Sequence, residues 1–349
     1  MPETLPFDSP PRILIVGPSW VGDMVMAQSL FITLQQYYPG AVLDVLAPAW
    51  SGPVLACMPQ VRRHLHMPVG HGRLGWGERR ALGHQLRGQY DWAIVLPNSL
   101  KSALIPWFAR IPVRTGWRGE LRYGLLNDLR VLDKARYPKM VERFVVLAWQ
   151  RGAELPGQLP RPRLEVEATQ RQQALEDLSL SQHRPVLALC PGAEFGRAKK
   201  WPEDYYAQVA CRWMDSGGQV WIFGSQNDLD TARTIAGQVD GDVQVLAGRT
   251  TLEQAVALLS CADQVVSNDS GLMHVAAALD RPLVVVYGST SPGFTPPLSD
   301  QAHTVQSTIE CSPCFERTCR FGHYACLTEL KPETVMKEIR HWPDVIARG

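Results

Sequence analysis

One stretch combines helix-capping residues with a histidine directly after an apolar run. It reads VVSNDSGLMHVAAAL and contains Asp269, Ser270, Gly271 and His274. Asp and Ser favour the start of a helix, and glycine allows a close backbone approach. The N–H groups of a helix start, with the helix dipole behind them, favour a phosphate, to which His274 could add a donor. The pattern predicts an anion site, and simple capping beside a core histidine explains the same residues about as well.

A second turn, CPGAEFGRAKKW, is long for a connection between a strand and a helix. It holds Gly192, Glu194, Lys199 and Lys200. A lysine placed over a leaving diphosphate would offset the charge that develops there. The alternative is a solvated basic loop.

A third turn, FGSQNDLD, contains Asp228 and Asp230. That spacing sometimes holds a divalent metal on a nucleotide sugar. Both acids fall in the first turn of an expected helix, where they complement its dipole, and we favour that interpretation.

The turn GPSWVGDMVMAQSL places Asp23 where the chain enters a helix. It lacks the G-x-G-x-x-G of a dinucleotide site and the Gly-Lys-Ser/Thr of a P-loop. A carboxylate repels phosphate, so the residues alone make Asp23 a helix cap or a general base.

Apolar runs alternate with helix-length segments through most of the chain. Helices are expected at 23–38, 99–109, 167–178, 202–216, 227–238, 251–261, 271–279 and 332–341. This alternation predicts two Rossmann-like, doubly wound α/β domains, whose ligands sit beyond the carboxyl ends of the strands. A segment rich in Pro, Gln, Gly and Arg near 152–163 marks the linker. We therefore expect domains at 1–165 and 166–330, with a C-terminal helical segment, 331–349, that packs back toward the first domain.

The net charge of +1 over 349 residues hides an asymmetry. Residues 1–150 carry 17 Lys and Arg against 10 Asp and Glu, whereas the remainder carries 18 against 24. A basic first half favours an anionic ligand there, and a solvated basic surface is the alternative. The sequence shows neither a run of roughly 20 apolar residues nor a secretory signal, so we expect a cytoplasmic protein.

Four of the eight cysteines are bunched near the C-terminus as C-x2-C-x4-C-x6-C, namely Cys311, Cys314, Cys319 and Cys326. Structural zinc, free thiols and a disulfide all remain open for this cluster. Its place after the last expected strand argues against a catalytic metal.

Taken together, the turns resemble the ADP-heptose:lipopolysaccharide heptosyltransferases, glycosyltransferase family 9. The resemblance spans nearly the whole chain and is strongest to members that add the second heptose of the inner core. Its strings are SWVGDMVMAQSL, DVLAPAW, MPVGHG, VLPNSLKSALIP, RTGWRGELRYGLLND, CPGAEFGRAKKWP, NDSGLMHVAAAL and GSTSPGFTPPLS.

The resemblance implies the GT-B fold, two Rossmann-like domains facing a cleft, and direct displacement of ADP with inversion. By resemblance Asp23 is the base and Lys199 contacts the diphosphate. The other donor residues that it implies are Gly192, Glu194, Asp228, Thr250, Asp269, Ser270, Gly271 and His274. It implies no required cofactor and no catalytic metal.

By the same resemblance the donor is ADP-L-glycero-D-manno-heptose and the acceptor is heptosyl-Kdo2-lipid A. A basic acceptor domain would steer this anionic lipid. The residues that we assign to acceptor binding are Asn98, Lys101, Arg118 and Arg122. The protein would then act peripherally at the inner face of the inner membrane. We expect no nucleic-acid partner.

Three other functions are weaker interpretations of the same sequence. A heptosyltransferase I-type activity differs only in the acceptor. An NAD-dependent oxidoreductase would need the absent G-x-G-x-x-G. A non-catalytic ADP-sugar-binding module would have no reason to keep Asp23.

Overall fold

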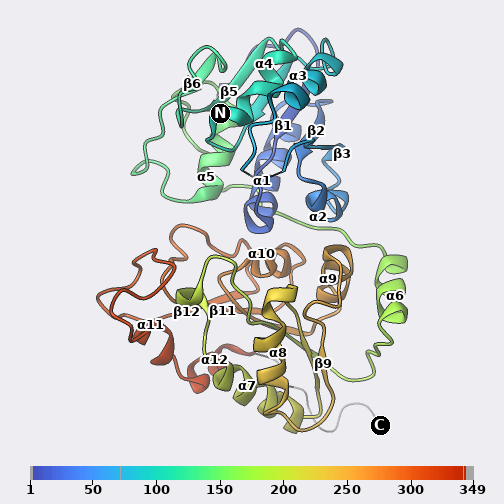
Figure 1. The fold of residues 1–349 in the computed structure, drawn as a ribbon, viewed down its shortest axis with the longest axis vertical. Coiled ribbons are helices and arrows are strands. Elements are labelled where there is room, and N and C mark those ends of the chain that lie inside the picture. Colours follow the sequence, from blue (N-terminus) through green and yellow to red (C-terminus); the bar gives the residue numbers. More distant parts are fainter. Residues whose placement is uncertain (1–2, 71, 341, 343–349) are drawn as a thin grey trace. The chain divides into compact units, whose positions relative to one another are not determined.

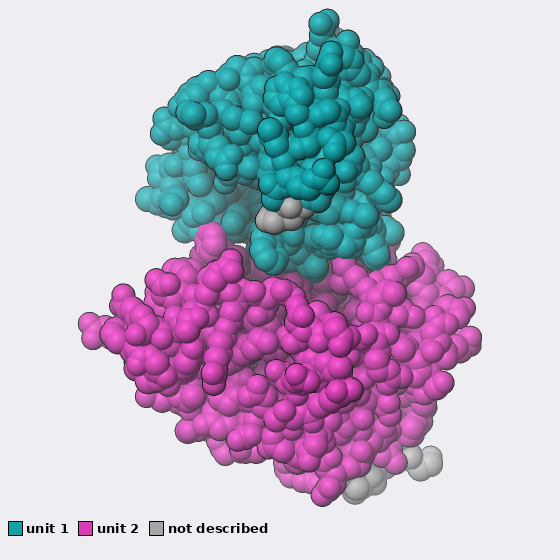
Figure 2. Space-filling model, viewed as in Figure 1, with its two compact units in different colours: residues 1–162 teal, residues 163–349 magenta. Residues whose placement is uncertain are grey.

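The computed structural model describes residues 3–70, 72–340 and 342. The chain divides into two compact units, Met1–Pro162 and Arg163–Gly349, coloured separately in Figure 2. Each unit contains one six-stranded sheet whose pairings are all parallel, which confirms the expected doubly wound α/β class.

Unit 1 carries strands in the order β3-β2-β1-β4-β5-β6 (Figure 1). Its elements, with 3₁₀ helices written η, are β1 (Arg12–Val16), α1 (Val21–Tyr37), β2 (Val42–Ala47), η1 (Ala49–Ser51), α2 (Gly52–Ala56), β3 (Val61–His66), α3 (Trp76–Gln85), β4 (Trp92–Val95), η2 (Leu100–Ala103), α4 (Leu104–Phe108), β5 (Val113–Trp117), β6 (Asp128–Arg130), α5 (Met140–Val145) and η3 (Val146–Ala148).

Two helical layers cover the sheet of unit 1. Helix α1 packs with α5, and α3 packs with α4. Leu14 and Val16 of β1 and Ala93 and Val95 of β4 belong to the same buried cluster as Ile105 of α4. Successive strand residues point to opposite faces, so Ile13 and Ile15 face the other layer. Both faces are buried, which is why these strands read as continuous apolar runs.

Unit 2 carries strands in the order β12-β11-β10-β7-β8-β9. Its elements are α6 (Ala168–Asp177), β7 (Val186–Cys190), η4 (Arg197–Lys199), α7 (Glu203–Asp215), β8 (Gln219–Ile222), η5 (Gln226–Asp228), α8 (Leu229–Ala236), β9 (Val243–Val245), α9 (Leu252–Leu259), β10 (Gln264–Asn268), α10 (Gly271–Ala278), β11 (Leu283–Tyr287), β12 (Ala302–Gln306), α11 (Ala325–Thr328) and α12 (Pro332–Glu338).

The order of unit 2 places the ends of β11, β10, β7 and β8 next to one another. Because all pairings are parallel, the turns that follow these strands meet at one edge of the sheet. Those turns include the three that the sequence marks for an anion or a nucleotide sugar.

Local signals set the helix ends. Helix α1 stops at Tyr37, two residues before Pro39, and the residue before a proline is disfavoured in a helix. Helix α7 ends ahead of Gly217, whose φ of 90° is the left-handed conformation that closes a helix at little cost for glycine.

The units divide at 162/163, three residues before the expected boundary, and α6 packs on α9 within unit 2. The described C-terminal helix α12 packs on α7, β11 and β12 of its own unit. Residues 341 and 343–349 of the expected C-terminal segment lie outside the described residues, and packing of that segment toward unit 1 stays a prediction.

Candidate active site

Lys199 and Asp269 meet in unit 2 as a buried ion pair. Lys199 Nζ lies 2.6 Å from Asp269 Oδ2, and the two side chains are 14% and 4% exposed. The Thr290 hydroxyl donates to the same oxygen at 2.6 Å. The Lys199 ammonium also lies 4.9 Å from the centre of the Phe195 ring. The sequence predicted separate roles for Lys199 and Asp269, and the fold joins them in one cluster.

Ser270 begins helix α10 directly after this cluster. It is the N-cap, and its Oγ accepts from the backbone N of Met273 at 3.4 Å. Gly271 is the first residue of the helix proper. The helix start and the Lys199 ammonium are therefore neighbours, and both favour an anion.

His274 lies inside the same helix and is 5% exposed. Burial lowers its pKa to about 4, with Asp269 opposing the shift and Lys199 adding to it. The imidazole is therefore neutral at pH 7. A buried, neutral His274 agrees with the second interpretation of the sequence, a histidine of the core.

Asn268 holds this edge of the sheet together. Its Oδ1 accepts from Trp201 N at 3.1 Å and from Tyr206 Oη at 3.0 Å, and its Nδ2 donates to Pro191 O at 2.6 Å. One fully buried amide thus ties the end of β10 to both ends of the turn after β7. Asparagine is a common helix-capping type, but here the Asn268 side chain bonds across the edge of the sheet.

Thr290 is a residue of this cluster that its sequence neighbours do not indicate. It is 5% exposed and follows β11 in GSTSPGF, part of a string that carries the family resemblance. Its partner, Asp269, is 21 residues away along the chain. No local pattern could have paired them.

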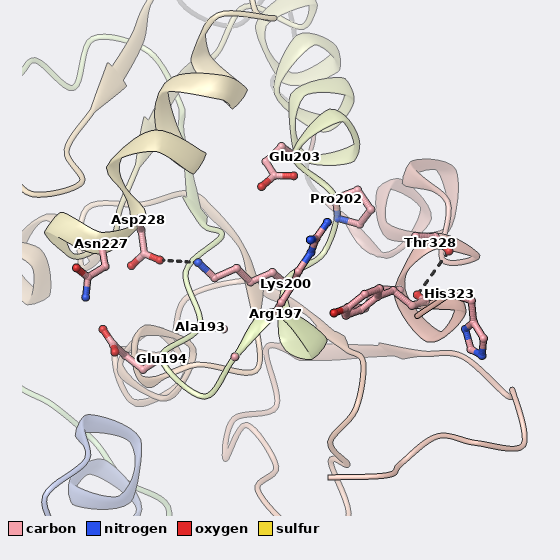
Figure 3. Close-up of a pocket in the computed structure, with 13 residues that line it drawn as sticks. Ala193, Glu194, Arg197, Lys200, Pro202, Glu203, Asn227, Asp228, His323 and Thr328 are labelled. Atoms are coloured by element: carbon pink, nitrogen blue, oxygen red, sulfur yellow. Dashed lines mark hydrogen bonds and ion pairs between the residues drawn. The ribbon is translucent and has the colours of Figure 1, made fainter. Parts of the chain in front are cut away.

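A pocket of 710 Å³ opens beside this cluster, within unit 2 (Figure 3). It is lined by Glu194, Arg197, Lys200, Asp228 and residues of the 323–328 segment, among others. Lys200 extends to Asp228, with 3.1 Å between Nζ and Oδ1, while His323 and Thr328 stand on the opposite side (Figure 3).

Asp228 is held from several sides. Its Oδ2 accepts from Ser225 N at 3.0 Å and from Ser225 Oγ at 2.8 Å, a capping box at the start of η5. A Cβ on Gly192 would fall 2.6 Å from the same oxygen, so only glycine allows this approach. Asp228 lies in the first turn of η5 and Asp230 in the first turn of α8, the positions that the dipole interpretation expects. Thr250, by contrast, lies in the turn between β9 and α9 and does not line this pocket.

In unit 1, Asp23 lies half-buried in the first turn of α1. The N-cap of that helix is Trp20, whose side chain makes no capping hydrogen bond. The negative charge of Asp23 complements the helix dipole at this position.

The four residues assigned to the acceptor differ in exposure. Asn98 and Arg118 are exposed and Lys101 is half-buried, whereas Arg122 is fully buried. The Arg122 guanidinium is bonded inside the unit, and its assignment to the acceptor stays a prediction.

Arg122 fastens two loops of unit 1. It donates through Nη1 to Pro97 O at 2.6 Å, and through Nη2 to Trp117 O and to Asn98 Oδ1, the latter at 3.4 Å. Burial lowers the pKa of Arg122 to about 10, and Glu120 opposes the shift. Its guanidinium joins the ends of β4 and β5 and so sets the position of Asn98.

The cysteine cluster gives no support for a structural metal. In the described ranges no three His, Cys, Asp or Glu side chains come together as a metal site. Cys311, Cys314 and Cys319 are half-buried thiols, and Cys326 is buried, which raises its pKa to about 11. None of these four forms a disulfide.

None of the described helices has both the length and the apolarity that crossing a bilayer requires.

Comparisons with known proteins give the family. The family model described as glycosyltransferase family 9 (heptosyltransferase) matches residues 79–325. Lipopolysaccharide heptosyltransferase 2 of Salmonella typhimurium is 50% identical over 338 residues, which cover 94% of this chain and 97% of that protein. Lipopolysaccharide heptosyltransferase 1 of Escherichia coli is 26% identical over 299 residues, 81% of this chain and 89% of that protein.

A solved structure agrees with these relatives. The structure of E. coli ADP-heptose lps heptosyltransferase II superposes with a TM-score of 0.85 at 48% identity and covers 94% of this chain and 97% of that one. This match confirms the expected GT-B fold class. The chain therefore belongs to glycosyltransferase family 9, the heptosyltransferase family.

Proposed function

We propose that this chain transfers L-glycero-D-manno-heptose from ADP-heptose to the heptose of heptosyl-Kdo2-lipid A, with inversion at the anomeric carbon. The observation that carries this proposal is the 50% identity, over nearly the whole of both chains, with a relative named heptosyltransferase 2. The identity with heptosyltransferase 1 is 26%, which disfavours addition of the first heptose.

The donor site is proposed at the edge of the unit 2 sheet. The Lys199 ammonium and the start of α10 at Ser270 and Gly271 offer positive charge and backbone N–H groups to the diphosphate. As ADP leaves, its negative charge grows, and donors that are already in place stabilise it without reorganisation. Asp269, fixed by Lys199 and Thr290, accepts hydrogen bonds from heptose hydroxyls.

The remaining donor contacts follow from the neighbouring turns. We assign Thr250, in the turn after β9, to the adenosine and Asp228 to the ribose, and Glu194 lines the same pocket as Asp228. Asp228 is already bonded to Lys200 and Ser225, so it meets a hydroxyl through its remaining lone pairs. Gly192 keeps the backbone close to Asp228.

Asp23 is proposed as the general base on the acceptor side. The acceptor hydroxyl gives its proton to the Asp23 carboxylate as its oxygen bonds to the anomeric carbon. The bond from that carbon to the ADP oxygen breaks, and ADP leaves with the electron pair. A carboxylate suits this transfer because the hydroxyl becomes acidic only as the new bond forms.

The acceptor is proposed to bind over the β4 and β5 ends of unit 1. Lys101 and the exposed Arg118 offer positive charge to the phosphates and carboxylates of the acceptor, and Asn98 lies nearer the reacting sugar. Arg122 acts as a positioning residue through its bonds to Pro97 and Asn98. The protein would work peripherally at the cytoplasmic face of the inner membrane.

Two experiments test the proposal. The first offers ADP-heptose with acceptors that carry zero, one or two heptoses. Extension of the one-heptose acceptor alone is expected, and extension of the zero-heptose acceptor instead would establish the heptosyltransferase I-type activity.

The second compares Asp23→Asn with the unmodified chain. Turnover should fall while ADP binding, measured by calorimetry, stays unchanged. Transfer at close to the original rate would exclude Asp23 as the base. Binding of NAD would favour the oxidoreductase alternative.

A further inference from the structure

Exposed aromatic and basic side chains gather on helices α3 and α4 of unit 1. Leu74 and Trp76 are each 51% exposed, and Trp107 is 40% exposed. The rings of Trp76 and Trp107 lie 5.1 and 4.9 Å from the ring of Phe108. We call this region the α3–α4 surface, defined by Leu74, Trp76, Arg80, Arg87, Trp107 and Arg110.

A close helix contact brings these side chains together. A Cβ on Gly83 of α3 would fall 2.4 Å from Phe108 Cβ and 3.0 Å from Ile105 O of α4. Only glycine allows this approach. The aromatic residues of the two helices therefore form one patch.

Three arginines lie near His84 of α3, and the acidic Glu78 of the same helix pairs with Arg73. Arg80, Arg87 and Arg110 are exposed, and Arg87 Nη2 lies 3.2 Å from His84 Nε2. Desolvation, followed by the positive charges of Arg87, Arg80 and Arg110, lowers the pKa of His84. Three guanidinium groups thus act on one imidazole. An exposed apolar patch with a charged rim is typical of an interaction surface.

Arg110 occupies a position that suits glycine better. Its φ is 55°, in the left-handed region, at the turn where Ile111 N bonds to Pro106 O at 3.2 Å and closes α4. A residue other than glycine is disfavoured in this conformation. The chain carries an exposed arginine there, so a third positive charge lies at this surface.

The α3–α4 surface is fixed to the loop that carries Lys101. Arg79, only 4% exposed, donates through Nε to Leu74 O at 2.7 Å and through Nη1 to Lys101 O at 3.2 Å. Lys101 lies in η2, whose first residue, Leu100, donates through its N to Glu120 Oε2 at 2.7 Å. Leu121, the next residue, is 77% exposed. The surface is therefore tied through the buried Arg79 to the segment proposed to bind the acceptor.

We propose that the α3–α4 surface docks onto an anionic lipid bilayer, with Trp76 and Trp107 at the level of the headgroups and the arginines on the lipid phosphates. Tryptophan suits this level because its ring is apolar and its N–H is polar. Arginines are attracted by an anionic leaflet. A second copy of the chain fits less well, because it would set the same three positive charges against themselves.

This proposal rests on the proposed function only for the reason why the protein would bind a membrane. An acceptor anchored in a bilayer has to be reached at the bilayer surface. Its test needs neither donor nor acceptor. The two ideas can therefore fail separately.

The experiment measures sedimentation of the full-length chain with vesicles of phosphatidylcholine, alone or mixed with phosphatidylglycerol. The unmodified chain should bind the mixed vesicles, less so as salt rises. Arg80→Gln with Arg110→Gly should bind about 30-fold more weakly, since each basic residue contributes about fivefold, or about 1 kcal/mol. Glycine removes the strain at position 110, so this variant should keep its melting temperature.

Trp76→Ser with Trp107→Ser should also lose vesicle binding. Matched controls come from unit 2, where Arg233 and Phe321 are exposed. Arg233→Gln with Phe321→Ser should bind vesicles like the unmodified chain. All the α3–α4 variants should still extend a water-soluble, deacylated acceptor, whereas Asp23→Asn should bind vesicles normally and fail to extend it.

Three results would overturn the proposal. One is equal binding to the two kinds of vesicle. Another is folded α3–α4 variants that sediment like the unmodified chain. The third is a dimer, seen by ultracentrifugation, that the tryptophan variant dissociates, which would make this surface a contact between copies.

Discussion

Replacing Lys199 with methionine should destabilise unit 2 by leaving the Asp269 carboxylate without its cation. The carboxylate is 4% exposed, and the lysine that neutralises it lies at 2.6 Å. Methionine has a similar length and no charge, so it keeps much of the contact with Phe195 and removes the ion pair. Thr290 then remains as the partner that the structure gives to Asp269 Oδ2.

Removing one partner of a buried ion pair costs about 3–5 kcal/mol, because the other charge stays buried without compensation. The remaining Thr290 hydroxyl and the 14% exposure of Lys199 place this case at the lower end, about 3 kcal/mol. For a unit of this size each kcal/mol lowers the melting temperature by about 2–4 °C, so a shift of roughly 6–12 °C is expected.

Differential scanning calorimetry of the full-length chain, at one fixed scan rate, measures this shift. Lys200→Met is the matched control, because Lys200 is the adjacent residue and its partner keeps other bonds. Lys200 is 26% exposed, and Asp228 retains both bonds from Ser225. The control should shift by less than half as much.

A double-mutant cycle completes the test. Lys199→Met combined with Asp269→Asn should cost less than the sum of the two single changes, since the double variant buries no unpaired charge. Equal shifts for the two lysine variants, or strictly additive losses in the cycle, would refute the claim that Lys199 and Asp269 form a coupled buried pair.

Three further predictions concern stability at the same edge of the sheet. Burial lowers the pKa of His274 to about 4, from about 6.5 in the unfolded chain. The neutral imidazole therefore contributes about 3 kcal/mol to the free energy of unfolding above pH 6.5, and this contribution is lost as the pH falls toward 4. His274→Gln should flatten the loss of melting temperature between pH 6.5 and 4, and an unchanged slope would place the titration elsewhere. Asn268→Ala leaves three buried groups without their partner and should cost about 3 kcal/mol, seen as a lower urea midpoint; an unchanged midpoint would show that Asn268 does not fasten the turn after β7. Gly192→Ala forces a methyl group to within 2.6 Å of Asp228 Oδ2 and should cost about 1–3 kcal/mol in melting experiments, whereas Gly157→Ala, which meets open space, should be neutral; equal effects would contradict the close approach.

The sequence determined the class of the fold. Apolar runs such as ILIV and LVVV, followed by helix-length segments, indicate parallel strands with both faces covered, and the expected helices at 23–38 and 271–279 appear as α1 and α10. The capping type of Ser270 and the length of the turn after β7 were also visible, because helix starts and strand ends depend on nearby residues.

The sequence pattern does not predict strand β3. It reads VRRHLH, which lacks an apolar run. Its two arginines are satisfied by Asp44 on the neighbouring strand, with 2.6 Å from Arg62 Nη2 and 2.7 Å from Arg63 Nη2 to Asp44 Oδ2. The partner is remote in sequence, so the strand could be recognised only after the sheet was assembled.

Only the tertiary structure decided which side chains act together. Lys199 and Asp269 are 70 residues apart, and the buried Arg122 bonds to Pro97, 25 residues away. The sequence supplied the residue types, since local preferences fix helices, caps and turns. The pairing of charges, the burial of Arg122 and the fastening role of Asn268 depend on how parallel strands order themselves in a sheet, and that order brings distant turns to one edge.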